Sequence, residues 1–182
     1  MKPATVHPPS ASSADDDVEL PWAREPKFRC FGCSPRNPIG LALRLRRMPS
    51  GEISAETTFS DDYASYPGIV HGGIVSTLAD EVMGDMLALR FGMLAFSLSL
   101  RMRMLLPLRV GEPYLTVARI TGSGNGVVRT EADITGPDGE LHVVANAAYQ
   151  PIRSDQARLL MGLDDAEHAR LGHYFDHEMG TV

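Results

Sequence analysis

One long apolar segment, flanked on both sides by alternating sequences, constrains the fold of this chain more than any other feature. Between Gly72 and Gly92 the apolar residues recur three and four positions apart, which is the period of a helix. They lie at positions 74, 75, 78, 79, 82, 83, 86, 87 and 89. Because this apolar stripe is wide, we expect the helix to be largely buried, and Gly92 suits its C-terminal end.

The segments around this helix alternate apolar and polar residues, which is the period of a half-buried strand. Before the helix, LALRLRRM (41–48) and EISAETTF (52–59) predict a hairpin. After it, four strands are predicted at 94–105, 112–123, 126–136 and 140–150, and Gly-rich turns between the last three favour antiparallel pairing. In 94–105 the even positions are apolar and are expected to face the core. One apolar helix with one antiparallel sheet implies an α+β fold whose sheet wraps around the helix.

The 182 residues suit a single domain with extensions at both ends. Residues 1–20 hold almost no apolar side chains and are expected to be a disordered tail. Residues 21–152 are assigned to the domain, including a Pro- and Gly-rich arm at its start. Residues 153–182 form a C-terminal extension, in which one amphipathic helix is expected over 154–171, beginning at Ser154-Asp155.

Composition excludes several classes of protein. The net charge of −6 argues against a partner that is a nucleic acid, because nucleic-acid-binding domains are basic. No apolar run of 18 residues is present, so no membrane helix is expected. The N-terminal residues do not form a secretory signal, and two cysteines then indicate reduced thiols in the cytoplasm.

The stretch YPGIVHGGIVSTLADE (66–81) places His-Gly-Gly, six further residues and an acid at the start of the predicted helix. This pattern, between strands, resembles the hotdog-fold acyl-CoA thioesterases of the phenylacetic-acid-degradation (PaaI-like) type, over roughly residues 28–151. A second stretch, CFGCSPRNPIGL (30–41), is similar to an N-terminal motif in a subset of these proteins. The resemblance implies hydrolysis of an acyl-CoA substrate without a cofactor or metal, by a homodimer or by a homotetramer built as a dimer of dimers.

Thioester hydrolysis needs a group that activates or replaces water and donors for the developing oxyanion. A helix N-terminus offers free backbone N–H groups, and Gly72 and Gly73 begin this helix. The resemblance assigns the oxyanion role to Gly72 and the catalytic carboxylate to Asp80, either as nucleophile or as general base. Glu81, about 100° further around the helix, is the rival acid and is otherwise expected to contact the substrate.

Other candidate residues follow from the same resemblance. His71 is expected to orient the turn before the helix, next to the substrate. Ser65 stands where some relatives carry an Asn that contacts the thioester, and Ser97 where related enzymes carry a Ser or Thr near the attacking water. The candidates for binding the CoA phosphates are Arg101, Arg103, Arg109, Arg119 and Arg129.

The Cys30-x-x-Cys33 pair has three interpretations. A structural zinc ion needs four protein ligands, and no second close Cys or His pair is evident. A redox pair of the thioredoxin type expects a βαβ context, which the predicted elements lack. The interpretation we favour is an ordered loop with buried thiols near the acyl or CoA site.

Two other functions remain as alternatives to the thioesterase. An acyl-thioester hydratase or dehydratase usually needs a His–acid pair, which His71 and Asp80, nine positions apart, fit poorly. A non-catalytic module that binds acyl-CoA or an aromatic ligand would use the same fold without turnover.

Overall fold

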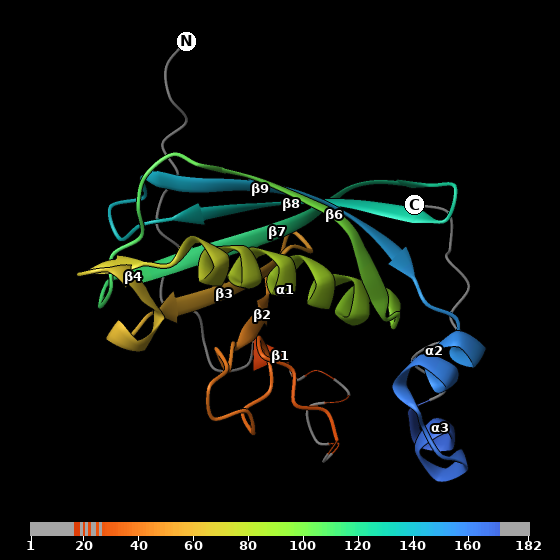
Figure 1. Cartoon of the computed structure of the whole chain (residues 1–182). Coiled ribbons are helices and arrows are strands. Elements are labelled where there is room, and N and C mark those ends of the chain that lie inside the picture. The colour runs from red at the N-terminus through yellow and green to blue at the C-terminus, as the bar shows by residue number, and fades with distance from the viewer. Residues whose placement is uncertain (1–16, 19, 21, 23–24, 26, 172–182) are drawn as a thin grey trace.

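An antiparallel sheet curves around one long helix in the computed structural model of the chain (Figure 1). The structure describes residues 17–171, except 19, 21, 23–24 and 26. The sheet has seven strands in the spatial order β1 (Asp17–Val18), β2 (Leu45–Arg47), β3 (Ile53–Thr58), β7 (Pro113–Gly124), β8 (Val127–Thr135), β9 (Leu141–Pro151) and β6 (Ala95–Met104). Every neighbouring pair is antiparallel, which confirms the α+β architecture expected from the alternation.

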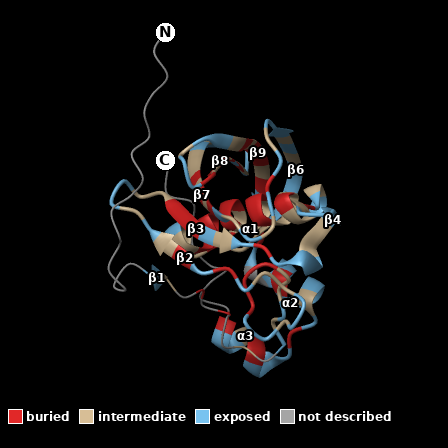
Figure 2. Cartoon of the chain, turned by 90° about the vertical axis from the view of Figure 1, so that its left-hand side faces the viewer, coloured by how far each residue is buried: buried red, intermediate tan, exposed pale blue. Residues whose placement is uncertain are grey.

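The central helix α1 (Gly72–Phe91) occupies the predicted segment and packs against β3, β6, β7, β8 and β9. Its inward face is fully buried, as Figure 2 shows, and carries Val75, Leu78, Ala79, Val82, Met83, Met86, Leu87 and Ala88. Gly92 ends the helix in the left-handed conformation (φ 65°), and its N–H donates to the carbonyl oxygen of Ala88 at 2.8 Å. Because a residue with a Cβ rarely adopts this conformation, glycine fits the position.

A short hairpin sets the start of α1. It pairs β4 (Ala64–Tyr66) with β5 (Ile69–Val70), directly after a 3₁₀ turn at Asp61–Tyr63. The N–H of Val70 donates to the carbonyl oxygen of Leu108, and the N–H of His71 donates to that of Tyr63. These bonds fix the direction in which the chain enters the helix.

Strand β6 departs from the predicted alternation. Its pairing with β9 shifts register between Ser97 and Ser99, so Leu98 forms a bulge. Ser97 therefore lies opposite the buried Tyr149, on the helix side, whereas Phe96 and Leu98 are 49% and 54% exposed. The expectation that all even positions face the core is wrong for these two residues, because one extra residue reverses the face of a strand.

The strand predicted at 41–48 is also shorter than expected, since only Leu45–Arg47 pair as β2. Ala42 has a left-handed backbone (φ 48°). The N–H groups of Leu41 and Leu43 donate instead to the carbonyl oxygens of Phe31 and Gly32 in the arm. These residues thus tie the arm to the domain rather than extending the sheet.

Both chain ends differ from the prediction. Most of the tail assigned to residues 1–20 lies outside the described residues, but Asp17 and Val18 pair with β2 and Leu20 is buried. The boundary of 20 is therefore too late, because strand pairing and one apolar side chain order this part. The helix expected over 154–171 is two helices, α2 (Ser154–Met161) and α3 (Asp165–Leu171), separated where Gly162 is left-handed (φ 60°).

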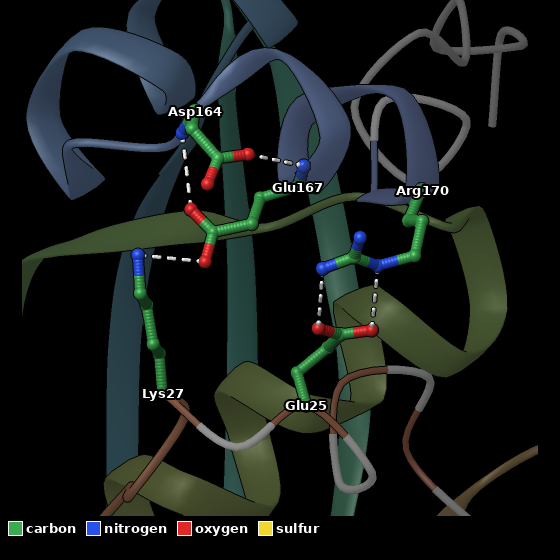
Figure 3. Close-up of polar contacts among 5 residues, drawn as sticks. All are labelled: Glu25, Lys27, Asp164, Glu167 and Arg170. Atoms are coloured by element: carbon green, nitrogen blue, oxygen red, sulfur yellow. Dashed lines mark hydrogen bonds and ion pairs between the residues drawn. The ribbon is translucent and has the colours of Figure 1, made fainter.

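Ion pairs join α3 to the N-terminal arm, as Figure 3 shows. Lys27 lies 2.7 Å from Glu167, and Arg170 lies 3.3 Å from Glu25. At the start of α3, Asp164 and Glu167 each accept a hydrogen bond from the other's N–H, at 2.8 and 3.0 Å. This reciprocal arrangement is a capping box.

None of the described helices is long and apolar enough to span a membrane.

Candidate active site

The carboxylate of Asp80 is held by two hydroxyl groups from two different strands. Ser97 of β6 and Tyr149 of β9 each donate to its Oδ1 atom at 2.8 Å. The second oxygen, Oδ2, accepts no hydrogen bond from a described residue and is the atom that remains available to water or substrate. The side chain of Asp80 is partly exposed. This differs from the buried position that the wide apolar stripe of the helix predicts.

Tyr149 is the member of this group that sequence reasoning missed. Its side chain is 1% exposed, and its ring lies over Gly84 of α1, where an added Cβ would come 3.5 Å from the ring atom Cε1. Burial, and secondly the charge of Asp80, raise the pKa of Tyr149, so the phenol stays protonated and acts as a donor. An inward tyrosine in an alternating strand carries no signal that distinguishes it from a core residue.

Gly72 and Gly73, at the N-terminus of α1, differ in whether their backbone N–H groups have a hydrogen-bond acceptor. His71 is the N-cap, and its Nδ1 atom accepts a hydrogen bond from the N–H of Gly73 at 2.9 Å. The N–H of Gly72 has no acceptor among the described residues, and the flexible end of Met104 lies beside it. Gly72 therefore presents the free donor, whereas the donor of Gly73 is occupied by the cap.

None of the other candidate residues in the described chain forms a hydrogen bond with Asp80. Ser65 is exposed on β4 and donates to the carbonyl oxygen of Ile69 at 3.4 Å, within its own hairpin. Arg119 pairs with Glu131 and Asp133 at 3.2 and 2.8 Å. The other arginine candidates have exposed side chains, namely Arg101, Arg103, Arg109 and Arg129.

Glu81 points to the arm rather than to the group around Asp80. The thiol of Cys30 donates to its Oε1 atom at 2.9 Å. Burial, and secondly the bond from Cys30, raise the pKa of Glu81 to about 7. Asp85, one helical turn further on, is 7% exposed, and burial holds the pKa of its carboxyl well above the usual value.

Two hollows in the described part of the chain lie away from Asp80. One of about 340 Å³ is lined by residues of β1, the arm and β2, and another of about 310 Å³ lies between the arm and β3. Neither is lined by Asp80, Ser97 or Gly72. The candidate catalytic groups thus stand on a surface of the single chain, not in one of these cavities.

The family model described as thioesterase superfamily matches residues 67–142, which include α1 and most of the sheet. No relative is found among the curated protein sequences. A solved structure of a thioesterase superfamily protein is 25% identical, with a TM-score of 0.60, over 64% of this chain. The match spans only 60% of the length of that protein.

Other solved structures share the fold at lower identity. A protein from Streptococcus mutans UA159, bound to acetyl CoA, is 20% identical with a TM-score of 0.55, covering 60% of this chain and 88% of its own. The E. coli PaaI protein from the phenylacetic acid degradation operon is 16% identical with a TM-score of 0.56, covering 60% and 83%. These likenesses confirm the expected arrangement of an antiparallel sheet around a central helix.

Proposed function

We propose that this chain, whose residues 67–142 match the thioesterase superfamily model, is a hotdog-fold enzyme that hydrolyses an acyl-CoA thioester to the free acid and CoA. The observation that carries the proposal is the anchored carboxylate of Asp80, whose Oδ1 accepts two hydroxyl hydrogen bonds at 2.8 Å while Oδ2 is left free. A carboxylate held in this way is oriented for reaction at one oxygen atom.

The proposed chemistry divides between Asp80 and the helix N-terminus. Asp80 Oδ2 either removes a proton from the water that attacks the thioester carbonyl carbon, or attacks that carbon itself. In both routes the C–S bond breaks and CoA leaves as a thiolate that takes up a proton. In the direct route, water then hydrolyses the anhydride formed on Asp80 to the free acid. The N–H of Gly72, at the positive end of the α1 dipole, donates to the oxyanion that develops on the carbonyl oxygen. Ser97 and Tyr149 are positioning residues, because each holds Asp80 without reaching the reacting atoms.

The two halves of this machinery must come from different chains. Gly72 and Asp80 are eight positions apart, which at a rise of about 1.5 Å per residue is roughly 12 Å along one straight helix. A carbonyl group needs both its donor and its attacking atom at about 3 Å. Two α1 helices that run antiparallel across a two-fold axis would bring Gly72 of one chain to Asp80 of the other.

Strand β6 supports assembly into a homodimer. It is an edge strand of the sheet, and its exposed apolar side chains include Phe96, Leu98 and Met104, which are 49%, 54% and 51% exposed. Exposed apolar residues on an unpaired edge favour pairing with another chain. A dimer, or a dimer of such dimers, would cover this surface and close the site over Asp80.

The choice of CoA as the carrier rests on relatives. The S. mutans protein is bound to acetyl CoA, and a hypothetical thioesterase from Streptococcus pneumoniae TIGR4 was solved with coenzyme A. The hydratase alternative gains no support from the geometry, because among the described residues no hydrogen bond joins His71 to Asp80, whose partners are Ser97 and Tyr149.

The experiment is a hydrolysis screen over short, medium, long-chain and aromatic acyl-CoAs, with free thiol detected. Wild-type protein should release CoA from at least one class, and Asp80→Asn should lower kcat on that substrate by roughly 10²–10⁴-fold. Asp138→Asn, an exposed carboxylate in the β8–β9 turn, is the matched control and should be unchanged.

Three outcomes would reject the proposal. Asp80→Asn with kcat within about threefold of wild type would remove Asp80 from the chemistry. Loss of enoyl-CoA absorbance without thiol release would indicate a hydratase, and stabilisation by acyl-CoA without any turnover would indicate a binding module.

A further inference from the structure

Two cysteines of the arm lie against two acidic residues of α1, next to Asp80 but separate from its hydroxyl partners. The Sγ atoms of Cys30 and Cys33 and a carboxylate oxygen of Glu81 all lie within 4.8 Å of one another. Cys30 Sγ is 2.9 Å from Glu81 Oε1 and accepts a hydrogen bond from the N–H of Gly32 at 3.3 Å. The arm and α1, which are distant in sequence, thus bring three possible metal-ligand atoms close together.

Asp85 borders this group, although its oxygen atoms are not among the three ligand atoms that lie within 4.8 Å of one another. It follows Glu81 by four positions, so both carboxylates lie on one face of α1. Asp85 is 7% exposed, and its carboxyl lies against Glu81 and Cys33. Its Oδ2 atom is buried and has no hydrogen-bond partner among the described residues. A buried oxygen without a partner is costly, and it indicates a ligand that the chain itself does not supply.

The backbone between the two cysteines is shaped for this contact. A Cβ added at Gly32 would come 2.3 Å from Cδ of Glu81 and 2.5 Å from its Oε2. Any side chain at this position would push Glu81 away from the thiols. Glycine therefore allows the Cys-x-Gly-Cys turn of the arm to pack directly against α1. Cys33, the last residue of this turn, is 7% exposed.

We propose that Cys30, Cys33, Glu81 and Asp85 bind one Zn²⁺ ion that fastens the arm to α1. Two sulfur and two oxygen ligands suit the tetrahedral geometry of zinc, and cysteine pairs two residues apart are a usual zinc ligand spacing. Thiolates disfavour Mg²⁺ and Ca²⁺, which prefer oxygen ligands. Within the described chain, neither Glu81 nor Asp85 forms an ion pair with a basic residue, so a divalent cation would supply the positive charge that these groups lack.

The ion is structural rather than catalytic. Once Asp85 turns its free oxygen to the ion and completes the set, four protein ligands leave no position open for water or substrate. On binding, each thiol releases its proton and the sulfur donates to the metal. The ion holds Glu81 towards the arm, which keeps this carboxylate away from the neighbouring Asp80. A second Cys or His pair is not needed for this set of ligands, because its other two members are carboxylates.

The experiment measures metal binding directly on the full chain, purified without a metal-binding tag under reducing conditions. Wild-type protein should contain one zinc per chain by elemental analysis. After removal by a chelator, the melting temperature should fall, and added Zn²⁺ should restore it. Added Co²⁺ should give the thiolate-to-cobalt charge-transfer absorption and the intense visible bands of a tetrahedral site.

Variants assign the ion to these residues. Cys30→Ser should abolish the charge-transfer absorption, and Asp85→Asn, which keeps the shape of the side chain, should weaken zinc affinity by at least about tenfold. Asp138→Asn is the matched control, because Asp138, Glu140 and His142 also bring three ligand atoms together, on an exposed turn. This control should bind zinc as wild type does.

Three results would overturn the proposal. One is reduced, folded wild-type protein that takes up no stoichiometric zinc. Another is Asp138→Asn losing the metal while Asp85→Asn keeps it, which would move the ion to the exposed turn. The last is a Cys30–Cys33 disulfide, found by mass spectrometry of protein prepared without air. Should Cys30→Ser fail to fold, Asp85→Asn and the cobalt spectrum still decide the question.

Discussion

At the scale of single residues, the arrangement around Asp80 shows how a partly exposed carboxylate is given one orientation. The donors to Oδ1 come from β6 and β9, and Tyr149 also lies 2.9 Å from the carbonyl oxygen of Asp80 itself. Because Ser97 and Tyr149 are directly opposite in the β6–β9 register, the sheet sets the distance between the two hydroxyls. The bulge at Leu98 is what brings Ser97 to the helix side.

Removing the phenol oxygen tests this orientation. In Tyr149→Phe the ring still covers Gly84, but Asp80 loses one of its two donors. A hydrogen bond to a charged group contributes about 1.5–3 kcal/mol, so kcat on the best acyl-CoA should fall by roughly 10- to 100-fold with little change in KM. Steady-state kinetics measure kcat and KM separately.

Ser97→Ala is the companion variant. Both hydroxyls act on the same oxygen, so the double variant should lose less than the product of the two single effects. A Tyr149→Phe enzyme with wild-type kcat would show that the tyrosine only fills space in the core.

Residue types and spacing predicted part of this site and missed the rest. Asp80, Gly72 and Ser97 came from a local motif and its resemblance, and the structure brings Asp80 and Ser97 together. Tyr149 could not be found, because its role is defined by contacts between segments far apart in the chain. The occupied N–H of Gly73 depends on the rotamer of His71, which no spacing shows.

At the scale of elements, periodicity predicted α1 and the long strands because each buries one continuous face. The bulge in β6 could not be predicted, since it depends on the register with β9. The C-terminal segment is divided into two helices at Gly162, which has a left-handed backbone. The apolar pattern of the sequence is compatible with a glycine inside one helix and so does not reveal the break. The arm is ordered by its contacts with α1 and α3, and so has no periodic signal of its own.

Gly84 gives a test of helix packing. Its Cβ position is 3.5 Å from the nearest atom of Tyr149, an ordinary contact, so alanine fits. Ala is favoured over Gly in a helix interior by about 1 kcal/mol, and Gly84→Ala should therefore raise the melting temperature by about 2–4 °C. Calorimetry measures the shift, and Gly84→Leu, which would displace the ring, should lower it. A destabilised Gly84→Ala would mean that the helix and Tyr149 pack more tightly than the structure shows.

The contact between α3 and the arm should depend on pH. The bond from Lys27 and, secondly, the N–H of Asp164 lower the pKa of Glu167 below its usual 4.5. Its stabilising effect is therefore present above pH 4.5 and is lost as pH falls through the lower folded value. Asp164, whose pKa is lowered by the N–H of Glu167, acts in the same direction.

Backbone amide NMR of α3 measures this effect. Between pH 7 and about pH 3 the signals of α3 should lose their helical shifts before those of α1 do. Glu167→Gln should show the weakened contact already at neutral pH. An α3 that keeps its shifts down to about pH 3 would show that the ion pairs do not hold it.

At the scale of the whole molecule, one chain carries every proposed catalytic group but cannot place them around one thioester. The free N–H of Gly72 and the free oxygen of Asp80 stand at separate points of α1, and the apolar side chains of β6 remain exposed beside them. The proposed dimer resolves both features at once, since a second α1 supplies the missing half of each site.

The measurement that tests this account most directly compares two heterodimers, each purified through two different tags. In the first, one chain carries Asp80→Asn and the other Gly72→Pro, which removes the backbone N–H at a helix position that tolerates proline. In the second, one chain carries both changes and its partner is wild type. Gly72→Ala, which keeps the N–H and meets only the flexible end of Met104 at 3.3 Å, controls for the added side chain.

If each site combines Asp80 of one chain with Gly72 of the other, the first heterodimer keeps one intact site and should hydrolyse acyl-CoA at about half the wild-type rate. In the second, each site carries one lesion, so it should be as inactive as the two parent homodimers. The reverse result, an inactive first heterodimer and a half-active second one, would place both groups of a site on one chain and would contradict the account.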